Sequence, residues 1–389
     1  MKKLLYRIME WLEQLRVNTA LYYAYQKNKA ERGLCILSDL IKRYPHRADY
    51  YMLRGDVFRS MQKYELAIND YNKAIEIQPG LSRAYCCRAY VNMELKNFSA
   101  AKKDLDKTIE LEPKNVDTLF ERARVLEHLG MKKDADDDIN QALSIKPDFA
   151  DALAYRGGSL LCKGEIEKGL SDLNLALRID NENYYAYLQR GRLFHIQDNS
   201  THALLDLNRA LEKAPNSDEA FRSRGWVWYE LKKYEKAVQD FNQAILNNES
   251  SVGSYVGRAW ARIAIGQYQQ AIADSHKAIQ LETNGSDALY CLAWIKATCP
   301  NEQYRSGAEA LEFMKKAQNN EPSKTITTKR ICAAVYAENK MFDEAIRLQE
   351  EVVNESPKEK QLREESILVC FRNHKPYSSE SKTGEEIEE

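Results

Sequence analysis

Apolar and small side chains recur along this chain with the spacing of amphipathic helices, and the pattern repeats every 34 residues. The clearest copy, residues 218–251, places Phe221, Trp228 and Phe241 on two such helices separated by a short polar turn. Apolar residues three or four apart lie on one face of a helix. The pattern therefore predicts an all-helical chain built of helix–turn–helix repeats.

Seven regular copies begin at residues 48, 82, 116, 150, 184, 218 and 252, and positions below are counted from these starts. Two positions hold small residues in every copy, where a bulky side chain would overpack the contact between two helices. Position 8 is Gly55, Ala89, Ala123, Gly157, Gly191, Gly225 or Ala259. Position 20 is Ala67, Ala101, Ala135, Gly169, Ala203, Ala237 or Ala271. The spacing predicts closely packed helix pairs.

This 34-residue step, with small residues where helices touch and aromatic residues between them, resembles the tetratricopeptide repeat (TPR). The resemblance implies a right-handed superhelical solenoid of about ten repeats, each contacting only its neighbours. It also implies that the first helices line a concave groove, with positions 2, 5, 6, 9, 12 and 13 facing inward. The expected function is a scaffold that binds a peptide or protein segment in that groove.

The remaining segments are assigned by how far they depart from the regular copies. We expect an N-terminal capping helix at 1–13, a degenerate repeat at 14–47, regular repeats over 48–285, a repeat with a loop insertion at 286–324, a last repeat at 325–359, a C-terminal capping helix at 360–374 and a disordered acidic tail at 375–389. Lys2, Lys3 and Arg7 leave an alternative for the first helix, namely a membrane tether for an assembly factor.

The C-terminal section carries a second resemblance. The stretches LAWIKATCPNEQYRSGAEAL and AAVYAENKMFDEAIRLQEEV, followed by HKPY, are similar to the end of a set of bacterial TPR proteins. The similarity implies a bacterial source and assigns no function.

Charge and cysteine content narrow the class of partner and the compartment. Lys plus Arg number 57 and Asp plus Glu number 58, so the net charge is −1 and no basic field favours nucleic acid. The eight cysteines contain no CxxC pair and indicate a reduced, cytoplasmic protein. No stretch of about 18 apolar residues predicts a membrane-spanning helix.

The chain lacks the short motifs of common catalytic and metal sites, so we expect no enzyme, no cofactor and no metal. The acidic run at 134–138 is the nearest approach to a calcium loop. Such a loop needs glycine at its sixth place and glutamate at its twelfth, where this chain has Ile139 and Ile145.

Two oppositely charged positions occur in all seven regular repeats, and we call them together the Arg–Asp ladder. Position 7 is Arg54, Arg88, Arg122, Arg156, Arg190, Arg224 or Arg258. Position 23 is Asp70, Asp104, Asp138, Asp172, Asp206, Asp240 or Asp274. Aspartate can accept a bidentate bond from a guanidinium, so these positions predict structural ion pairs. The partner of Arg156 is either Asp172 in its own repeat or Asp138 in the repeat before.

Position 9 supplies the candidate partner-binding residues of the groove, which are Tyr90, Arg124, Arg192, Trp226, Trp260 and, in the next repeat, Trp294. Three consecutive tryptophans could form an aromatic platform for a peptide, because tryptophan is enriched at binding hot spots. The alternatives are packing against the neighbouring helix, and cover by the chain's own tail beyond Lys375. The chaperone-tail-binding branch of the family uses lysine and asparagine on this face to clamp a terminal carboxylate. Positions 5 and 9 of the first regular repeats do not match it, because they hold Met52, Asp56, Cys86 and Tyr90.

Overall fold

A computed structural model describes residues 14–20, 22–23, 29–282, 285–320 and 325–378. All regular secondary structure in these residues is helical. The chain forms two compact units, Met1–Ala186 and Tyr187–Glu389. The helix expected at 1–13 and the tail beyond residue 378 lie outside the described residues.

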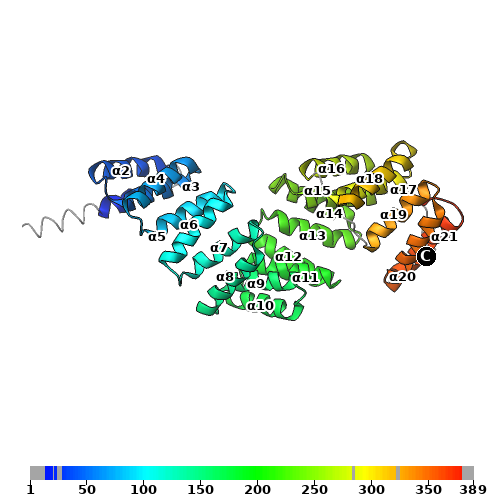
Figure 1. The fold of residues 1–389 in the computed structure, drawn as a ribbon, viewed down its shortest axis with the longest axis horizontal. Coiled ribbons are helices and arrows are strands. Elements are labelled where there is room, and N and C mark those ends of the chain that lie inside the picture. The colour runs from blue at the N-terminus through cyan, green and yellow to red at the C-terminus, as the bar shows by residue number, and fades with distance from the viewer. Residues whose placement is uncertain (1–13, 21, 24–28, 283–284, 321–324, 379–389) are drawn as a thin grey trace, which may run out of the picture. The chain divides into compact units, whose positions relative to one another are not determined.

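Unit 1 consists of successive helix pairs (Figure 1). Residues 14–20 are helical and precede α2 (Ala30–Arg43). The first helices of the regular pairs are α3 (Ala48–Ser60), α5 (Ser82–Glu94), α7 (Val116–His128) and α9 (Ala150–Cys162). The second helices are α4 (Tyr64–Ile77), α6 (Phe98–Leu111), α8 (Lys132–Ile145) and α10 (Ile166–Ile179).

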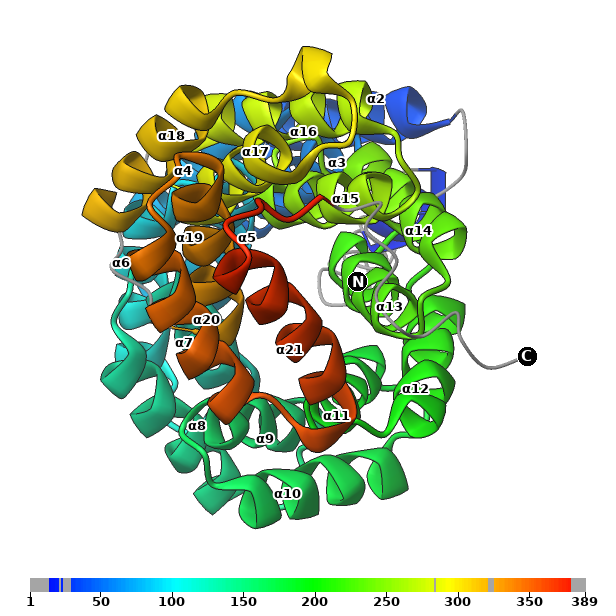
Figure 2. The ribbon, with the colours of Figure 1, turned by 90° about the vertical axis from the view of Figure 1, so that its right-hand side faces the viewer.

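Unit 2 continues the alternation, and the division between the units falls within α11 (Tyr184–Ile196). Its further first helices are α13 (Asp218–Glu230), α15 (Val252–Ala264), α17 (Ser286–Thr298) and α19 (Ile326–Glu338). Its second helices are α12 (Ser200–Lys213), α14 (Tyr234–Asn247), α16 (Tyr268–Leu281), α18 (Gly307–Asn320) and α20 (Phe342–Glu355). The chain then forms α21 (Lys358–Arg372), which lies beside α20 in Figure 2.

Each turn between the two helices of a regular pair contains one residue in the left-handed backbone region. Position 15 has a positive φ in all seven pairs, at Gln62, Lys96, Gly130, Gly164, Asp198, Lys232 and Gly266. Glycine adopts this conformation without steric cost, whereas Lys232 at φ 57° does so under strain.

The small residues permit close approach of the helices. An added Cβ at Gly225 would lie 2.9 Å from the Phe241 ring, and one at Gly257 in the next repeat would overlap the same ring. Phe241 is fully buried between these two glycines. Gly225 and Gly257 therefore allow one bulky ring to pack between two consecutive repeats.

The turn between α17 and α18 is lengthened by the insertion that the sequence indicates. It contains the 3-10 helix η1 (Glu302–Tyr304) and extends to Ser306. The Arg305 guanidinium pairs with Glu338 of α19 at 2.7 Å, and the amide of Asn339 donates to the carbonyl of Gly307. These contacts tie the longer turn to the following repeat.

Polar contacts fix α21 to the last repeat. Glu364 of α21 is 1% exposed and accepts hydrogen bonds from Arg330 of α19 and Gln349 of α20. These two hydrogen bonds compensate the carboxylate for the hydration that it loses on burial. The same part of the chain corrects an expectation, because residues 375–378 do not begin a free tail: Tyr377 is 5% exposed and belongs to the unit 2 core.

Candidate functional site

The structure places each arginine of the Arg–Asp ladder against the aspartate sixteen residues later in its own repeat. In the pair Arg156–Asp172, Nε and Nη2 of the arginine donate to the two carboxylate oxygens over 2.7 and 3.0 Å. The other six pairs have the same two-point geometry. Asp172, not Asp138, is therefore the partner of Arg156.

A third contact, which the sequence analysis missed, joins the ladder across repeats. Nη1 of Arg224 donates to Asn208 of the preceding repeat over 2.6 Å, and Arg258 does the same to Asn242. The equivalent acceptors in unit 1 are Ser38, Asn72 and Asp106. The signal is present in the sequence as a run of Asn, Asp or Ser at position 25.

These contacts occupy the ladder arginines within the fold. Asp240, the partner of Arg224, has a side chain that is 8% exposed. The Arg224 guanidinium donates to acceptors in two repeats. In unit 2 the ladder ends where the seventh regular repeat meets Leu292, which replaces the arginine at position 7. The Arg–Asp ladder thus consists of ion pairs within and between repeats.

The position 9 residues of unit 1 are engaged locally. Tyr90 is half-buried on α5, with the guanidinium of Arg59 5.8 Å from its ring centroid. Burial is the main cause that raises the pKa of Tyr90 above its ordinary value. Arg124 is exposed on α7 and pairs with Glu121 one turn earlier at 2.9 Å.

In unit 2, Arg192 of α11 reaches across to α13. Its Nε donates to the hydroxyl of Ser223 over 3.0 Å, and its Nη2 lies 3.3 Å from Glu219. The second contact is longer than the 2.7–2.9 Å of a strong charge-assisted hydrogen bond. Arg192 therefore retains capacity for another anionic acceptor.

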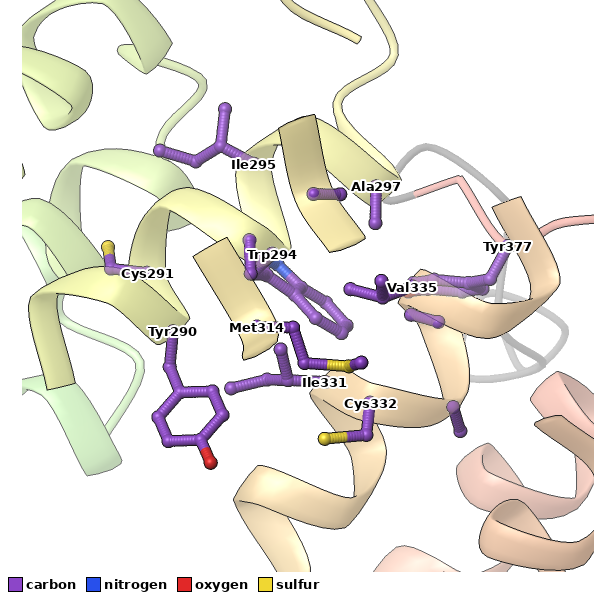
Figure 3. Packing of buried hydrophobic residues seen from close by; sticks show 14 of the residues in the cluster. Tyr290, Cys291, Trp294, Ile295, Ala297, Met314, Ile331, Cys332, Val335 and Tyr377 are labelled. Atoms are coloured by element: carbon purple, nitrogen blue, oxygen red, sulfur yellow. The ribbon is translucent and has the colours of Figure 1, made fainter. Parts of the chain in front are cut away.

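The three tryptophans do not share one environment. Trp226 of α13 and Trp260 of α15 are half-buried, and Trp226 packs edge-on against Phe241 and Tyr229. Trp294 of α17 is instead 8% exposed. Figure 3 shows its ring between Met314, Val335 and Tyr377, and the centroids of the Trp294 and Tyr377 rings are 6.0 Å apart.

Trp294 is consequently corrected from a partner-binding residue to a core residue. Its cover comes from α18 of the same repeat, from α19 of the next repeat and from the segment after α21. The expected row of three open rings is reduced to Trp226 and Trp260.

Arg222 of α13 is a further residue of this face that the sequence analysis did not single out. Its side chain is half-buried and extends toward Gly253 of α15, where an added Cβ would lie 3.2 Å from its Nη1. The buried Nε has no hydrogen-bond partner among the described residues. Burial is the main cause that lowers the pKa of Arg222 from its ordinary value, and the positive charge of Arg192 is the second cause.

We call Arg192, Arg222, Trp226, Tyr229 and Trp260 the first-helix surface of unit 2. They come from three consecutive first helices and combine two cationic side chains with three aromatic rings. Aromatic and arginine side chains are the residue types that dominate binding energy at interfaces. The surface has the composition of a binding site.

Comparisons with known families agree with this repeat structure. Family profiles described as "TPR repeat" and "Tetratricopeptide repeat" match residues 55–96, 82–115, 116–149 and 188–251. The chain is a TPR protein. No curated protein matches it in sequence.

Solved structures share the fold of this TPR protein. A chain of the APC/C hetero-tetramer Cut9–Hcn1 superposes with a TM-score of 0.58 and 16% identity, over 80% of this chain and 62% of that one. A monomeric mutant of IFIT1 with Gppp-AAAA gives 0.59 and 15%, over 93% and 90%. The human IFIT1 dimer with PPP-AAAA gives 0.54 and 16%, over 84% and 78%. These likenesses establish an all-helical TPR solenoid.

No group of three His, Cys, Asp or Glu side chains that could hold a metal ion comes together in the described part of this TPR protein. None of its eight cysteines forms a disulfide bond. Burial raises the pKa of Cys291 to about 12, which keeps that thiol protonated. None of the described helices has the length and apolar content required to cross a bilayer.

Proposed function

We propose that this TPR protein is an interaction scaffold and that the first-helix surface of unit 2 binds a peptide segment of another protein. The observation that carries the proposal is the pair Trp226 and Trp260, half-buried on consecutive first helices beside Arg222. Half-buried rings offer a partner large apolar area at low entropic cost, because their rotamers are already held by neighbours.

The family supports a binding role, since TPR arrays are scaffolds that present extended surfaces to other molecules. The Cut9–Hcn1 chain is part of a hetero-tetramer, whereas the two IFIT1 structures hold Gppp-AAAA and PPP-AAAA. The present chain has a net charge of −1, and its ladder arginines are neutralised by aspartates. The proposal therefore assigns it a protein ligand, no nucleic acid and no catalytic role.

The proposed location is the cytoplasm of a bacterium. Eight cysteines without a disulfide bond suit a reducing compartment, and the C-terminal motifs resemble those of bacterial TPR proteins. The alternative, tethering at a membrane by residues 1–13, is testable by fractionating the tagged full chain beside a variant that begins at Leu15. Release of the variant from the membrane fraction would favour the tether.

The scaffold proposal is tested by quantitative affinity purification with three baits, the wild type, Trp260→Ala and Trp228→Ala. Trp228 is a matched control because it lies on α13 but stacks with Lys233 and Lys236 instead of joining the first-helix surface. We expect a protein recovered by the wild type and by Trp228→Ala to be lost by Trp260→Ala, at a cost of about 2 kcal/mol. Equal recovery by all three baits, with an intact fold, would refute the proposal.

A further inference from the structure

The chain leaves α21 through a turn that its own backbone fixes. His374 adopts the left-handed region at φ 55°, and its N–H donates to the carbonyl of Phe371 over 2.9 Å. The N–H of Lys375 donates to the carbonyl of Cys370 over 3.0 Å. These two bonds form the Schellman motif that ends many helices. The motif sets the direction of the chain after α21, and we call residues 374–377 the C-terminal hook.

The C-terminal hook buries one side chain. Its first three residues are exposed, whereas Tyr377 is 5% exposed. The Tyr377 ring lies over Trp294 in Figure 3, with 6.0 Å between the two ring centroids. The Arg363 guanidinium of α21 donates a hydrogen bond to the Tyr377 hydroxyl. Because the residues between α21 and Tyr377 face water, release of this ring breaks few other contacts and leaves α21 in place.

The ring under the hook is continuous with the first-helix surface of unit 2. Trp294 occupies position 9, as Trp260 does in the preceding repeat. Trp260 packs against the hydrophobic cluster that contains both Trp294 and Tyr377. Burial raises the pKa of Tyr229 to about 12, and the nearby charge of Arg363 opposes that rise. The hook and α21 therefore reach the edge of the first-helix surface.

We propose that Tyr377 is an intramolecular cover, which closes the first-helix surface of unit 2 at Trp294 and leaves when a partner binds there. The inference rests on the proposed function, and it adds the regulation of that surface. A segment with few buried side chains opens at a lower free energy than packed helices do. A partner that displaces the hook gains Trp294 as a third ring beside Trp226 and Trp260. The closed hook lowers the partner's apparent affinity in proportion to the fraction of open molecules.

The first test uses the full chain without a partner and follows oxidation of its tryptophans by hydroxyl radicals. Tyr377→Ala removes the cover and should speed oxidation of Trp294 severalfold, while Trp228 reacts as in the wild type. Tyr377→Phe keeps the ring and should keep Trp294 protected. Leu362→Ala is the matched control, because Leu362 is 65% exposed on α21 and lies outside the hook. It should change neither tryptophan.

The second test supplies the cover in trans. The probe is the peptide acetyl-NHKPYSS-amide, which copies residues 373–379, and acetyl-NHKPASS-amide is its control. The tyrosine peptide should bind the Tyr377→Ala chain at least about tenfold more tightly than the wild type, in which the site is already filled. It should also restore protection of Trp294 in that variant. The alanine peptide should not distinguish the two chains.

The third test addresses regulation in the wild-type chain, with a protein recovered by affinity purification. In the bound complex, oxidation of Tyr377 should rise because the hook is displaced. Trp226 and Trp260 should become protected, and Trp294 should stay protected because the partner replaces the hook. The Tyr377→Ala chain should bind the same protein more tightly than the wild type does.

Four results would overturn the proposal. They are a Tyr377→Ala chain that fails to fold, which would make the ring permanent core, unchanged oxidation of Trp294 in that variant, equal binding of the tyrosine peptide to both chains, and a protected Tyr377 in the complex. If Tyr377 stays protected while Trp226 and Trp260 become protected, the cover fails and the scaffold surface stands. If Trp226 and Trp260 stay accessible in the complex, the scaffold surface fails, and the regulatory role of the hook fails with it.

Discussion

Replacing Arg224 by leucine tests whether the Arg–Asp ladder holds neighbouring repeats together. Arg224 donates two hydrogen bonds of 2.7 Å to Asp240 in its own repeat and one of 2.6 Å to Asn208 in the preceding repeat. Its side chain is 22% exposed and that of Asp240 is 8% exposed. The leucine variant would leave a buried carboxylate without its cation.

Breaking a buried ion pair by removing one partner costs about 3–5 kcal/mol. Because part of the Arg224 guanidinium is exposed, we expect the lower end, about 3 kcal/mol. Arg156 has a 34% exposed side chain, and the bonds found for it go to Asp172 alone. Arg156→Leu should therefore cost less, about 2 kcal/mol. The double change Arg224→Leu with Asp240→Leu should recover stability to within about 1 kcal/mol of the wild type.

The assay is urea unfolding of the full chain followed by tryptophan fluorescence. Four of the five tryptophans, at 226, 228, 260 and 294, lie in unit 2, so the emission reports mainly on the unit that contains Arg224. Repeat arrays can lose two-state behaviour, so transition midpoints are compared across the double-mutant cycle. Arg209→Leu, an exposed pair with Glu212, is the control. If Arg224→Leu shifts the midpoint no more than Arg209→Leu, the ladder does not stabilise the array.

Three further predictions concern single groups. Tyr71→Phe should destabilise unit 1 by about 2 kcal/mol in thermal unfolding, because the buried Tyr71 hydroxyl donates to Asp56 over 2.7 Å. The pKa of Glu230 is lowered below its ordinary 4.5, mainly by the hydrogen bond from His195. The stability that ionised Glu230 contributes is therefore lost as the pH falls below 4.5. Glu230→Gln should flatten this acid side of a plot of melting temperature against pH. Lys232→Gly should raise stability by about 1 kcal/mol by relieving left-handed strain, and no rise would show that the turn is unstrained.

The repeating features of this protein could be predicted because they depend on local sequence. The small residues at positions 8 and 20 give the helix pairs, and arginine at position 7 with aspartate at position 23 gives the ladder. The spacing alone left Asp172 and Asp138 open as partners of Arg156. Both are on second helices, and only the packing of the pair decides between them.

The candidate site depends on contacts that periodicity does not encode. Trp294 has the same repeat position as Trp226 and Trp260, yet Tyr377 from the far end of the chain covers it. Arg222 is visible in the sequence as the charged residue at position 5. The burial of its Nε and its close approach to Gly253 are properties of the packed helices and are not visible in the sequence.

Side-chain footprinting with hydroxyl radicals tests most directly where a partner binds. Trp226 and Trp260 are half-buried on the first-helix surface. Trp228 of α13 instead stacks with Lys233 and Lys236 at the start of α14. Addition of a protein recovered by affinity purification should slow oxidation of Trp226 and Trp260 and leave Trp228 unchanged. Unaltered oxidation of Trp226 and Trp260 in the fully bound complex would contradict the assignment of this surface as the binding site.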